Sequence, residues 1–428
     1  MMSMVVTSPL STGALRRMGR IAVTGLLLAL AAGCTTVIAR FPASEEQTLT
    51  AKPYGIDNGF IRAYGDNLGE ELRAQILRDR VDRAKAFRQA GGEGPVRISS
   101  IAFSGGGPDG AFGAGLLAGW TARGDRPTFG FVSGVSTGAI LALYAYLGPQ
   151  YDEALKEIYT SYETDDLVTP TIFAGLTGGT ALLSTAGYRK LIEDYISPAV
   201  VAELAAAHKD GRILLIGTTN IDASRPVVWN VGQIAASGHP DARRLIHDIV
   251  QASSAIPAAF PPVLIPVIDE NGRRFDEMHV DGGATQQVIL YSPEFSTRAL
   301  DKATGVEVNR EVFVVVNNKL RKAYDPVSPR IFSIAGRAAS SLIGGSGTGD
   351  IYRIFTVAQR DGIDFNVIAI PTEFDAEAES LFDPAYMQSL YDLGFEYGEA
   401  GDRWSPYPLD YITLEEAIQQ GEEVATSN

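Results

Sequence analysis

The stretch that most constrains the fold is Thr128–Tyr146, TFGFVSGVSTGAILALYAY. Strand formers such as Phe129 and Val132 predict a strand, and the apolar run after residue 138 predicts a helix. Between them lies GVSTG, a G-x-S-x-G pattern. A turn this sharp strains the serine backbone, lifts the hydroxyl off the sheet, and needs glycines where side chains would collide. Because the start of the helix offers unpaired N–H groups to a developing oxyanion, the stretch predicts a nucleophilic Ser136.

Strands and helices alternate along most of the chain, which predicts an α/β fold on a mostly parallel sheet. Besides the pair around Ser136, strands are expected at 96–103, 212–218, 226–230, 263–268, 273–280, 312–317 and 365–370. Further helices are expected at 68–90, 111–121, 199–208, 242–253, 331–357 and 385–399. The glycines of residues 344–347 predict a break in the helix at 331–357. Residues 155–195, a mixture of helix and loop, are a candidate lid or substrate channel.

Composition excludes some classes of function. The chain has 428 residues, of which 45% are hydrophobic, so it can bury a large core. Its formal net charge of -15 argues against a nucleic-acid partner and against docking on anionic lipid through bulk charge. The single cysteine excludes an intrachain disulfide and a cysteine metal cluster.

Residues 1–33 have the features of an export signal. Three arginines precede an apolar run at 21–32 that is too short to span a membrane comfortably. The run ends in LAAGC, where Cys34 is the only cysteine of the chain. The arrangement resembles the bacterial lipoprotein cleavage box, which implies lipidation of Cys34 and, with Thr35 next, the outer membrane of the cell envelope. A conventional secretory signal, a short anchor and a twin-arginine signal are the alternatives.

A second glycine-rich turn, SGGGPDG, begins at Ser104 between a predicted strand and a predicted helix. It satisfies the dinucleotide pattern G-x-G-x-x-G, which also needs an acidic residue at the end of the next strand. Asp125 has roughly the right spacing but precedes that strand, so a nucleotide site is disfavoured. The loop can instead direct backbone N–H groups at a substrate oxyanion beside the nucleophile, or it can simply be a tight turn.

Local pattern leaves two candidates for the residue that activates the serine. The four histidines are His208, His239, His247 and His279. The first three have no distinctive neighbours, whereas His279 lies two positions before Asp281 on a predicted strand and could lie near the site. Asp281 itself, followed by two glycines, is the other candidate base, in which case its pKa must be tuned. It could also be no more than a turn-forming aspartate.

Together these motifs resemble those of the patatin-like phospholipases. The sequences SGGGPDG, GVSTG, ASSAIPAAFPP and DGG occur in the order typical of that family. The resemblance implies a three-layer α/β/α sandwich with a mostly parallel central sheet and a Ser136–Asp281 dyad. It also implies an oxyanion hole from the N–H groups of Gly105, Gly106 and Gly107, a lipid ester as the substrate, and no metal or organic cofactor.

One residue departs from the family pattern. Many members carry Arg or Lys where this chain has Asp109. A carboxylate there would remove positive charge near the oxyanion hole but leave the backbone donors intact, which makes a neutral lipid or a simple acyl ester more plausible. The expected function is still a membrane-tethered serine lipid acyl hydrolase that cleaves fatty-acyl esters of phospholipids or lysophospholipids. The rival hypotheses are a different esterase or thioesterase and a catalytically silent lipid-binding protein of the envelope.

The expected organisation divides the chain into five segments. They are a signal peptide at 1–33, a flexible tether at 34–60, an N-terminal helical segment at 61–95, a patatin-like catalytic domain at 96–318, and a C-terminal α/β extension packed on it at 319–428.

Overall fold

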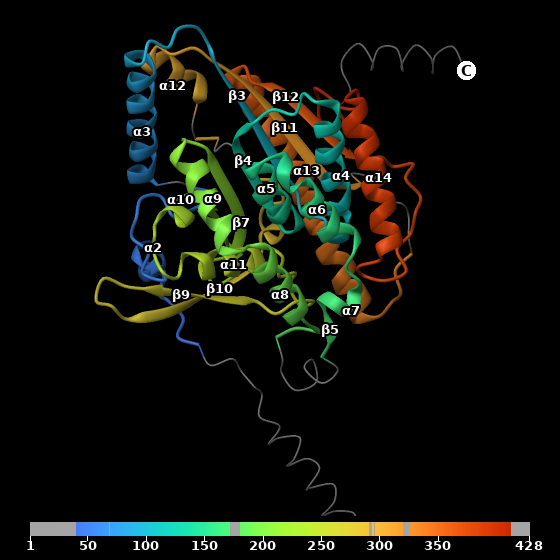
Figure 1. Ribbon diagram of the computed structural model, residues 1–428. Coiled ribbons are helices and arrows are strands. Elements are labelled where there is room, and N and C mark those ends of the chain that lie inside the picture. Colours follow the sequence, from blue (N-terminus) through green and yellow to red (C-terminus); the bar gives the residue numbers. More distant parts are fainter. Residues whose placement is uncertain are drawn as a thin grey trace, which may run out of the picture.

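The computed structural model describes residues 40–67, 69–171, 180–290, 293–294, 296–319 and 326–411 (Figure 1). The expected signal peptide, Cys34, the end of the C-terminal extension and the GLTGG stretch at 175–179 lie outside these residues. The strands are β1 (Lys52–Pro53), β2 (Arg62–Tyr64), β3 (Val96–Phe103), β4 (Phe129–Val135), β5 (Thr169–Pro170), β6 (Leu183–Ser184), β7 (Ile213–Asn220), β8 (Arg225–Asn230), β9 (Val263–Ile268), β10 (Arg274–Asp281), β11 (Val308–Lys319) and β12 (Asp364–Ile370).

The α-helices are α2 (Glu45–Thr50), α3 (Glu70–Gln89), α4 (Gly110–Arg123), α5 (Thr137–Leu147), α6 (Asp152–Thr160), α7 (Thr164–Leu167), α8 (Ala186–Tyr195), α9 (Pro198–Lys209), α10 (Val231–Ala236), α11 (Ala242–Ser253), α12 (Thr297–Thr304), α13 (Ile331–Asp361) and α14 (Pro384–Ala400). Short 3₁₀ turns are η1 (Gly107–Asp109), η2 (Pro149–Tyr151) and η3 (Gly282–Ala284).

Five parallel strands in the order β7-β4-β3-β11-β12 form the centre of the main sheet. The antiparallel strands β10, β9 and β1 extend it beyond β7, and β8 and β2 form a side branch on β7. The predicted α/β fold is therefore confirmed. Phe103 pairs with Gly134, so the glycine-rich loop after β3 and the serine turn after β4 emerge side by side.

Alternate residues of the central strands pack into two different cores, which defines three layers. On β11, Phe313 and Val315 face the core formed with α4, α5 and α14, whereas Val312 and Val314 face Ile351 and neighbouring residues of α13. Both faces of the parallel sheet are thus covered by helices, as parallel sheets require.

Helix α14 packs on α4 so closely that their backbones touch, and the two helices lie side by side in Figure 1. A Cβ atom at Gly115 or Gly119 of α4 would collide with a carbonyl oxygen of α14, and one at Gly394 or Gly398 of α14 with a carbonyl oxygen of α4. These four glycines therefore allow α14, in the C-terminal part of the chain, to pack directly against α4, the helix that follows the glycine-rich loop.

Residues 40–60 belong to the expected flexible tether at 34–60, but the structure shows them packed against the main sheet. Strand β1 pairs with β9, the Tyr54 N–H donates to the carbonyl oxygen of Pro266 at 2.8 Å, and the side chains of Ala51, Tyr54 and Ile56 are buried. Prolines in a polar segment predicted a linker. Here Pro53 instead ends a short edge strand, where its missing N–H costs no ladder bond, and the apolar residues after it complete the core.

The break predicted at residues 344–347 is also absent, since α13 is helical from Ile331 to Asp361. Each glycine lowers helix propensity by about 1 kcal/mol relative to alanine. Apolar residues such as Ile351, Ile354 and Ala358 pack the C-terminal half of the helix on the sheet, and this tertiary contact outweighs the local preference.

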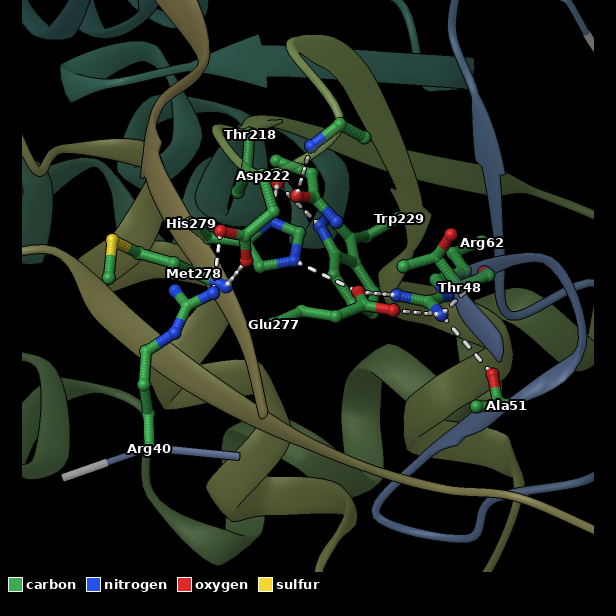
Figure 2. Close-up of polar contacts among 12 residues, drawn as sticks. Arg40, Thr48, Ala51, Arg62, Thr218, Asp222, Trp229, Glu277, Met278 and His279 are labelled. Atoms are coloured by element: carbon green, nitrogen blue, oxygen red, sulfur yellow. Dashed lines mark hydrogen bonds and ion pairs between the residues drawn. The ribbon is translucent and has the colours of Figure 1, made fainter. Parts of the chain in front are cut away.

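A buried polar network joins the N-terminal segment to β10 (Figure 2). The Arg62 guanidinium pairs with both carboxylate oxygens of Glu277, donates to the carbonyl oxygens of Thr48 and Ala51, and lies over the Trp229 ring. Burial alone would raise the pKa of Glu277, but the charge of Arg62 and the hydrogen bonds from His279 and Arg62 outweigh it and lower the pKa to about 2. The ionised pair therefore holds the segment against the strand that ends at Asp281.

This pair makes a prediction about stability. Glu277→Gln leaves the Arg62 charge buried without its counterion, so we expect the free energy of unfolding at pH 7 to fall by about 3 to 5 kcal/mol. Because the pKa of Glu277 is lowered by folding, its stabilisation is complete above pH 4.5 and is lost as the pH falls toward 2. Urea unfolding at several pH values measures both effects.

The matched control for this experiment is Asp194→Asn, which breaks an exposed ion pair with Lys190. Exposed pairs contribute little to stability, so no measurable change is expected. Equal losses in the two variants, or a Glu277→Gln variant that keeps the acid sensitivity of the wild type between pH 5 and 2, would contradict the argument.

Candidate active site

Ser136 occupies the turn between β4 and α5 with a φ of 56° and a ψ of -128°, a backbone conformation that L-residues rarely adopt. The glycines on either side are required by close contacts. A Cβ atom at Gly134 would collide with the carbonyl oxygen of Gly138, and one at Gly138 would lie 2.6 Å from the carbonyl oxygens of Phe103 and Ser104. The turn therefore has the geometry expected from the G-x-S-x-G pattern.

Ser253, the first serine of the ASSAIPAAFPP motif, supports this turn. The Ser136 N–H donates to Ser253 Oγ at 2.9 Å, and Ser253 Oγ donates to the carbonyl oxygen of Gly217 at 2.6 Å. Helix α11 ends at Ser253, so the motif brings a hydroxyl to the backbone of the strained serine. The sequence contained the motif but did not reveal this contact.

Asp281 ends β10, which lies on the far side of β7 from β4, and its side chain reaches the hydroxyl of Ser136. Asp281 is 3% exposed, and its carboxylate accepts the N–H of Gly283 at 2.7 Å. Burial raises its pKa to about 6, and the hydrogen bonds from Ser136 and Gly283 limit the rise. Asp281 is therefore a carboxylate whose basicity is increased beside a serine hydroxyl.

The glycine-rich loop after β3 lies against the serine. A Cβ atom at Gly105 would lie 2.9 Å from Ser136 Cβ, and one at Gly106 would collide with the backbone of Asn317. The Gly105 N–H donates to Gln287 Oε1 at 3.1 Å. No acceptor is found for the N–H groups of Gly106 and Gly107 in the part of the chain that the structure describes. Of the three expected oxyanion donors, Gly105 is thus already used within the protein.

Two asparagines at the end of β11 hold the carbonyl groups of this loop. Asn317 Nδ2 donates to the Ser104 carbonyl oxygen at 3.0 Å, and Asn318 Nδ2 donates to that of Gly105 at 2.7 Å. Sequence reasoning missed both. Their place at the carboxyl end of a strand expected to be parallel was the available signal, because polar residues at that edge of an α/β sheet commonly form sites.

A cavity of about 860 Å³ opens above these groups. It is bounded by the glycine loop, Ser136, Asp281 and Gln287, and its other walls are mainly apolar. The larger apolar lining residues are Ile140, Ile158, Leu167, Val168, Leu182, Leu191, Ile256, Phe260, Val288, Val316, Ile351, Leu381, Phe382 and Met387. Several of them come from residues 155–195, the candidate substrate channel, and others from the C-terminal part of the chain. The space suits a flexible apolar group such as an acyl chain.

The histidines do not reach this cavity. His279 lies in the network of Figure 2, where its Nδ1 contacts Thr218 Oγ1 at 2.9 Å and its Nε2 contacts Glu277 at 3.3 Å. Burial lowers its pKa. His208 and His247 bind backbone carbonyl oxygens, and His239 accepts the N–H of Asp241. Of the two candidate bases, only Asp281 therefore lies at the serine.

Asp109, which bears on the choice of substrate, and Asp125, which bears on the nucleotide-site alternative, are not among the described residues that line the cavity. Asp109 accepts a hydrogen bond from the Tyr386 hydroxyl of α14 at 2.8 Å. Asp125 precedes β4, whereas the glycine-rich loop follows the parallel strand β3, so the two lie at opposite ends of the sheet. The acidic partner that a dinucleotide site needs is therefore missing from the loop. Within the described ranges, no group of three or more His, Cys, Asp or Glu side chains could hold a metal ion.

Comparison with known proteins identifies the central part of the chain. Residues 101–291 match the family model for patatin-like phospholipase, and they include the glycine-rich loop, Ser136 and Asp281. The similarity to patatin-like phospholipases is thus found for residues 101–291, which are less than half of the chain. Among solved structures it is similar to the crystal structure of VipD from Legionella pneumophila, at 11% sequence identity, with a TM-score of 0.36 and coverage of 73% of this chain and 68% of that chain. No curated protein matches it.

The backbone strain at Ser136 makes a prediction about stability. Glycine adopts a positive φ without steric cost, so Ser136→Gly should raise the free energy of unfolding by about 1 kcal/mol while removing the hydroxyl. Ser136→Ala also lacks the hydroxyl but keeps the Cβ atom, so it should not gain this stability. Denaturant unfolding of the two variants and the wild type measures the difference. A glycine variant no more stable than the alanine variant would show that the turn is not strained.

Proposed function

We propose that this protein is a serine lipid acyl hydrolase that cleaves fatty-acyl esters of phospholipids or lysophospholipids through a Ser136–Asp281 dyad. The observation that supports it most is the contact between a strained serine and a buried, basic carboxylate at one end of a large apolar cavity. The match of residues 101–291 to patatin-like phospholipases supports the same reaction class.

In the proposed acylation step, Asp281 accepts the proton of the Ser136 hydroxyl while the oxygen attacks the ester carbonyl carbon. The carbonyl π electrons move to oxygen, where the N–H groups of Gly106 and Gly107 and the start of α5 stabilise the negative charge. The intermediate then collapses, the C–O bond to the alcohol breaks, and the proton held by Asp281 passes to the departing alkoxide. The products are the free alcohol and an acyl ester of Ser136.

Deacylation uses the same groups. Asp281 accepts a proton from a water molecule as its oxygen attacks the acyl carbon, and the oxyanion again lies at the glycine loop. When the second intermediate collapses, the proton returns to Ser136 Oγ and a fatty acid leaves. A carboxylate with an ordinary pKa would be a weak base for both steps, so the elevated pKa of Asp281 makes a dyad without histidine chemically reasonable.

The cavity also bears on the substrate. Asp109 contacts Tyr386 and lies outside the cavity lining, so its charge no longer argues against a phospholipid substrate. The apolar walls fit an acyl chain. A non-phospholipid esterase or thioesterase is the alternative substrate assignment.

Ser136→Ala and Asp281→Asn should each lower the hydrolysis of p-nitrophenyl decanoate and of a fluorescent phospholipid by at least about 100-fold. A fluorophosphonate probe should label the wild type but not Ser136→Ala. Because folding raises the pKa of Asp281, the ionised carboxylate is disfavoured by burial, so Asp281→Asn should remain folded. Thermal melts of both variants control for loss of structure.

The pH dependence of kcat/KM adds a separate check. Asp281 acts as a base only when it is ionised, so kcat/KM should fall below about pH 6, the pKa to which burial raises the carboxyl group.

Turnover that survives Ser136→Ala would exclude Ser136 as the nucleophile. A wild type that hydrolyses the decanoate but not the phospholipid would favour the alternative esterase, and one inactive on every acyl ester would favour a silent lipid-binding protein.

We further propose that Cys34 carries a lipid that anchors the protein in the bacterial outer membrane. The support is the LAAGC box after a short apolar run. None of the helices that the structure describes is long and apolar enough to cross a bilayer.

Bacteria that express the chain and are fed an alkyne-tagged fatty acid should label the wild type but not Cys34→Ser, because the thiol is the acceptor of the lipid. Membrane fractionation then reports the location. Equal labelling of the two proteins, or a wild type in the soluble fraction, would contradict the anchor.

A further inference from the structure

Gln287 lies between the glycine-rich loop and the turn that follows Asp281. Its Oε1 accepts the N–H of Gly105 at 3.1 Å, and a Cβ atom at Gly105 would lie 2.8 Å from that oxygen. A Cβ atom at Gly283 would collide with Gln287 Nε2 and would lie 3.0 Å from Asp281 Oδ1. The amide group of this side chain is therefore packed against the glycine loop on one side and the Asp281 turn on the other.

A buried carboxylate on α13 holds Gln287 in turn. Asp350 Oδ2 accepts the backbone N–H of Gln287 at 2.7 Å and that of Val288 at 3.1 Å, while Arg353 donates to Asp350 Oδ1 at 3.0 Å. Asp350 is 8% exposed, and two N–H donors on one oxygen define the path of this backbone closely. Asp350 lies beyond the region at 101–291 that matches the phospholipase family.

We infer that Gln287, oriented by Asp350, is a positioning residue that sets the oxyanion loop. By accepting the Gly105 N–H, it fixes the orientation of the loop so that the N–H groups of Gly106 and Gly107 remain for the substrate oxygen. Without that acceptor, the Gly105 N–H is left unpaired in a buried place, and the loop can relax by turning the N–H toward the cavity. The inference rests on the proposed function, since it assigns a role within that reaction.

The loss of turnover expected on removing Gln287 follows from how strongly turnover depends on the position of the oxyanion donors. Removing one oxyanion donor lowers turnover by about 100- to 1000-fold, and a displacement of about 1 Å lowers it by about 100-fold. Gln287 acts through the loop and leaves both donors in the protein, so a loss of about 10- to 100-fold is expected. Because the loop contacts the tetrahedral oxyanion more strongly than the ground-state ester, the loss should appear in kcat and not in KM.

The chain offers a closely matched control in the adjacent residue. Gln286 and Gln287 have the same side chain and the same exposure of 6%. Gln286 Nε2 donates to the carbonyl oxygen of Val288 at 3.3 Å, and Gln286 is not among the described residues that line the cavity. Gln287→Leu and Gln286→Leu each remove a buried amide, so any general loss of stability should be similar, whereas only the first touches the oxyanion loop.

The experiment compares these variants in the full chain. Gln287→Leu should lower kcat on p-nitrophenyl decanoate by about 10- to 100-fold with KM nearly unchanged, and it should weaken binding of octyl boronic acid by a similar factor. The boronic acid forms a tetrahedral anion on a serine oxygen, whereas octanoate, which forms none, should bind both variants like the wild type. Asp350→Asn should reduce kcat in the same direction, and its effect should be non-additive with Gln287→Leu because the two act as a unit.

Hydrogen exchange separates this inference from the proposed function. The peptide that contains residues 104–107 should exchange faster in Gln287→Leu than in Gln286→Leu or the wild type. An active wild type whose Gln287→Leu and Gln286→Leu variants have the same kcat and the same boronic acid affinity would overturn the positioning role. A wild type that neither hydrolyses acyl esters nor binds the boronic acid would overturn the proposed function and this role with it. Unchanged hydrogen exchange of residues 104–107 in Gln287→Leu would by itself refute the ordering of the oxyanion loop by Gln287.

Discussion

The site depends on the close approach of the first turn of α5 to the ends of β3 and β4. Only a residue without a side chain fits at Gly138, where the carbonyl oxygens of Phe103 and Ser104 leave no room for a Cβ atom. At this approach the backbone of Ser136 has a positive φ, and the serine lies beside the glycine-rich loop. The parallel pairing of β3 with β4 makes the approach possible, because both turns then emerge at the same edge of the sheet.

A second set of interactions tunes the site through burial. Asp281 is almost completely enclosed, and the cost of enclosing its charge raises its pKa into the range where a carboxylate can act as a base near neutral pH. Glu277, on the same strand, is buried to a similar degree but has a lowered pKa because Arg62 supplies the opposite charge. Two carboxylates four residues apart thus differ in basicity because only one of them faces a guanidinium.

The C-terminal part of the chain contributes to the site from outside the matched domain. Strand β12 completes the parallel sheet, α14 packs backbone to backbone against α4, and α13 brings Asp350 to the loop that follows Asp281. Asn317 and Asn318, at the end of β11, hold the carbonyl groups of the glycine loop. The described residues after 291 are therefore part of the architecture that shapes the cavity, and the family match covers only some of the residues that line it.

The sequence by itself determined the α/β class, most strand and helix positions, and the four motifs that meet around the cavity, because each depends on local patterns. Alternation and apolar periodicity predict strands and helices, and glycines mark turns that other residues cannot form. Local pattern could not exclude His279 as a partner of the serine, nor could it show that residues 40–60 pack on the sheet or that α13 continues through its glycines. Those outcomes, and the contacts of Ser253, Gln287 and Asp350, depend on groups far apart in the chain. Only tertiary structure decided them, because burial and hydrogen bonding between distant segments outweigh local propensity.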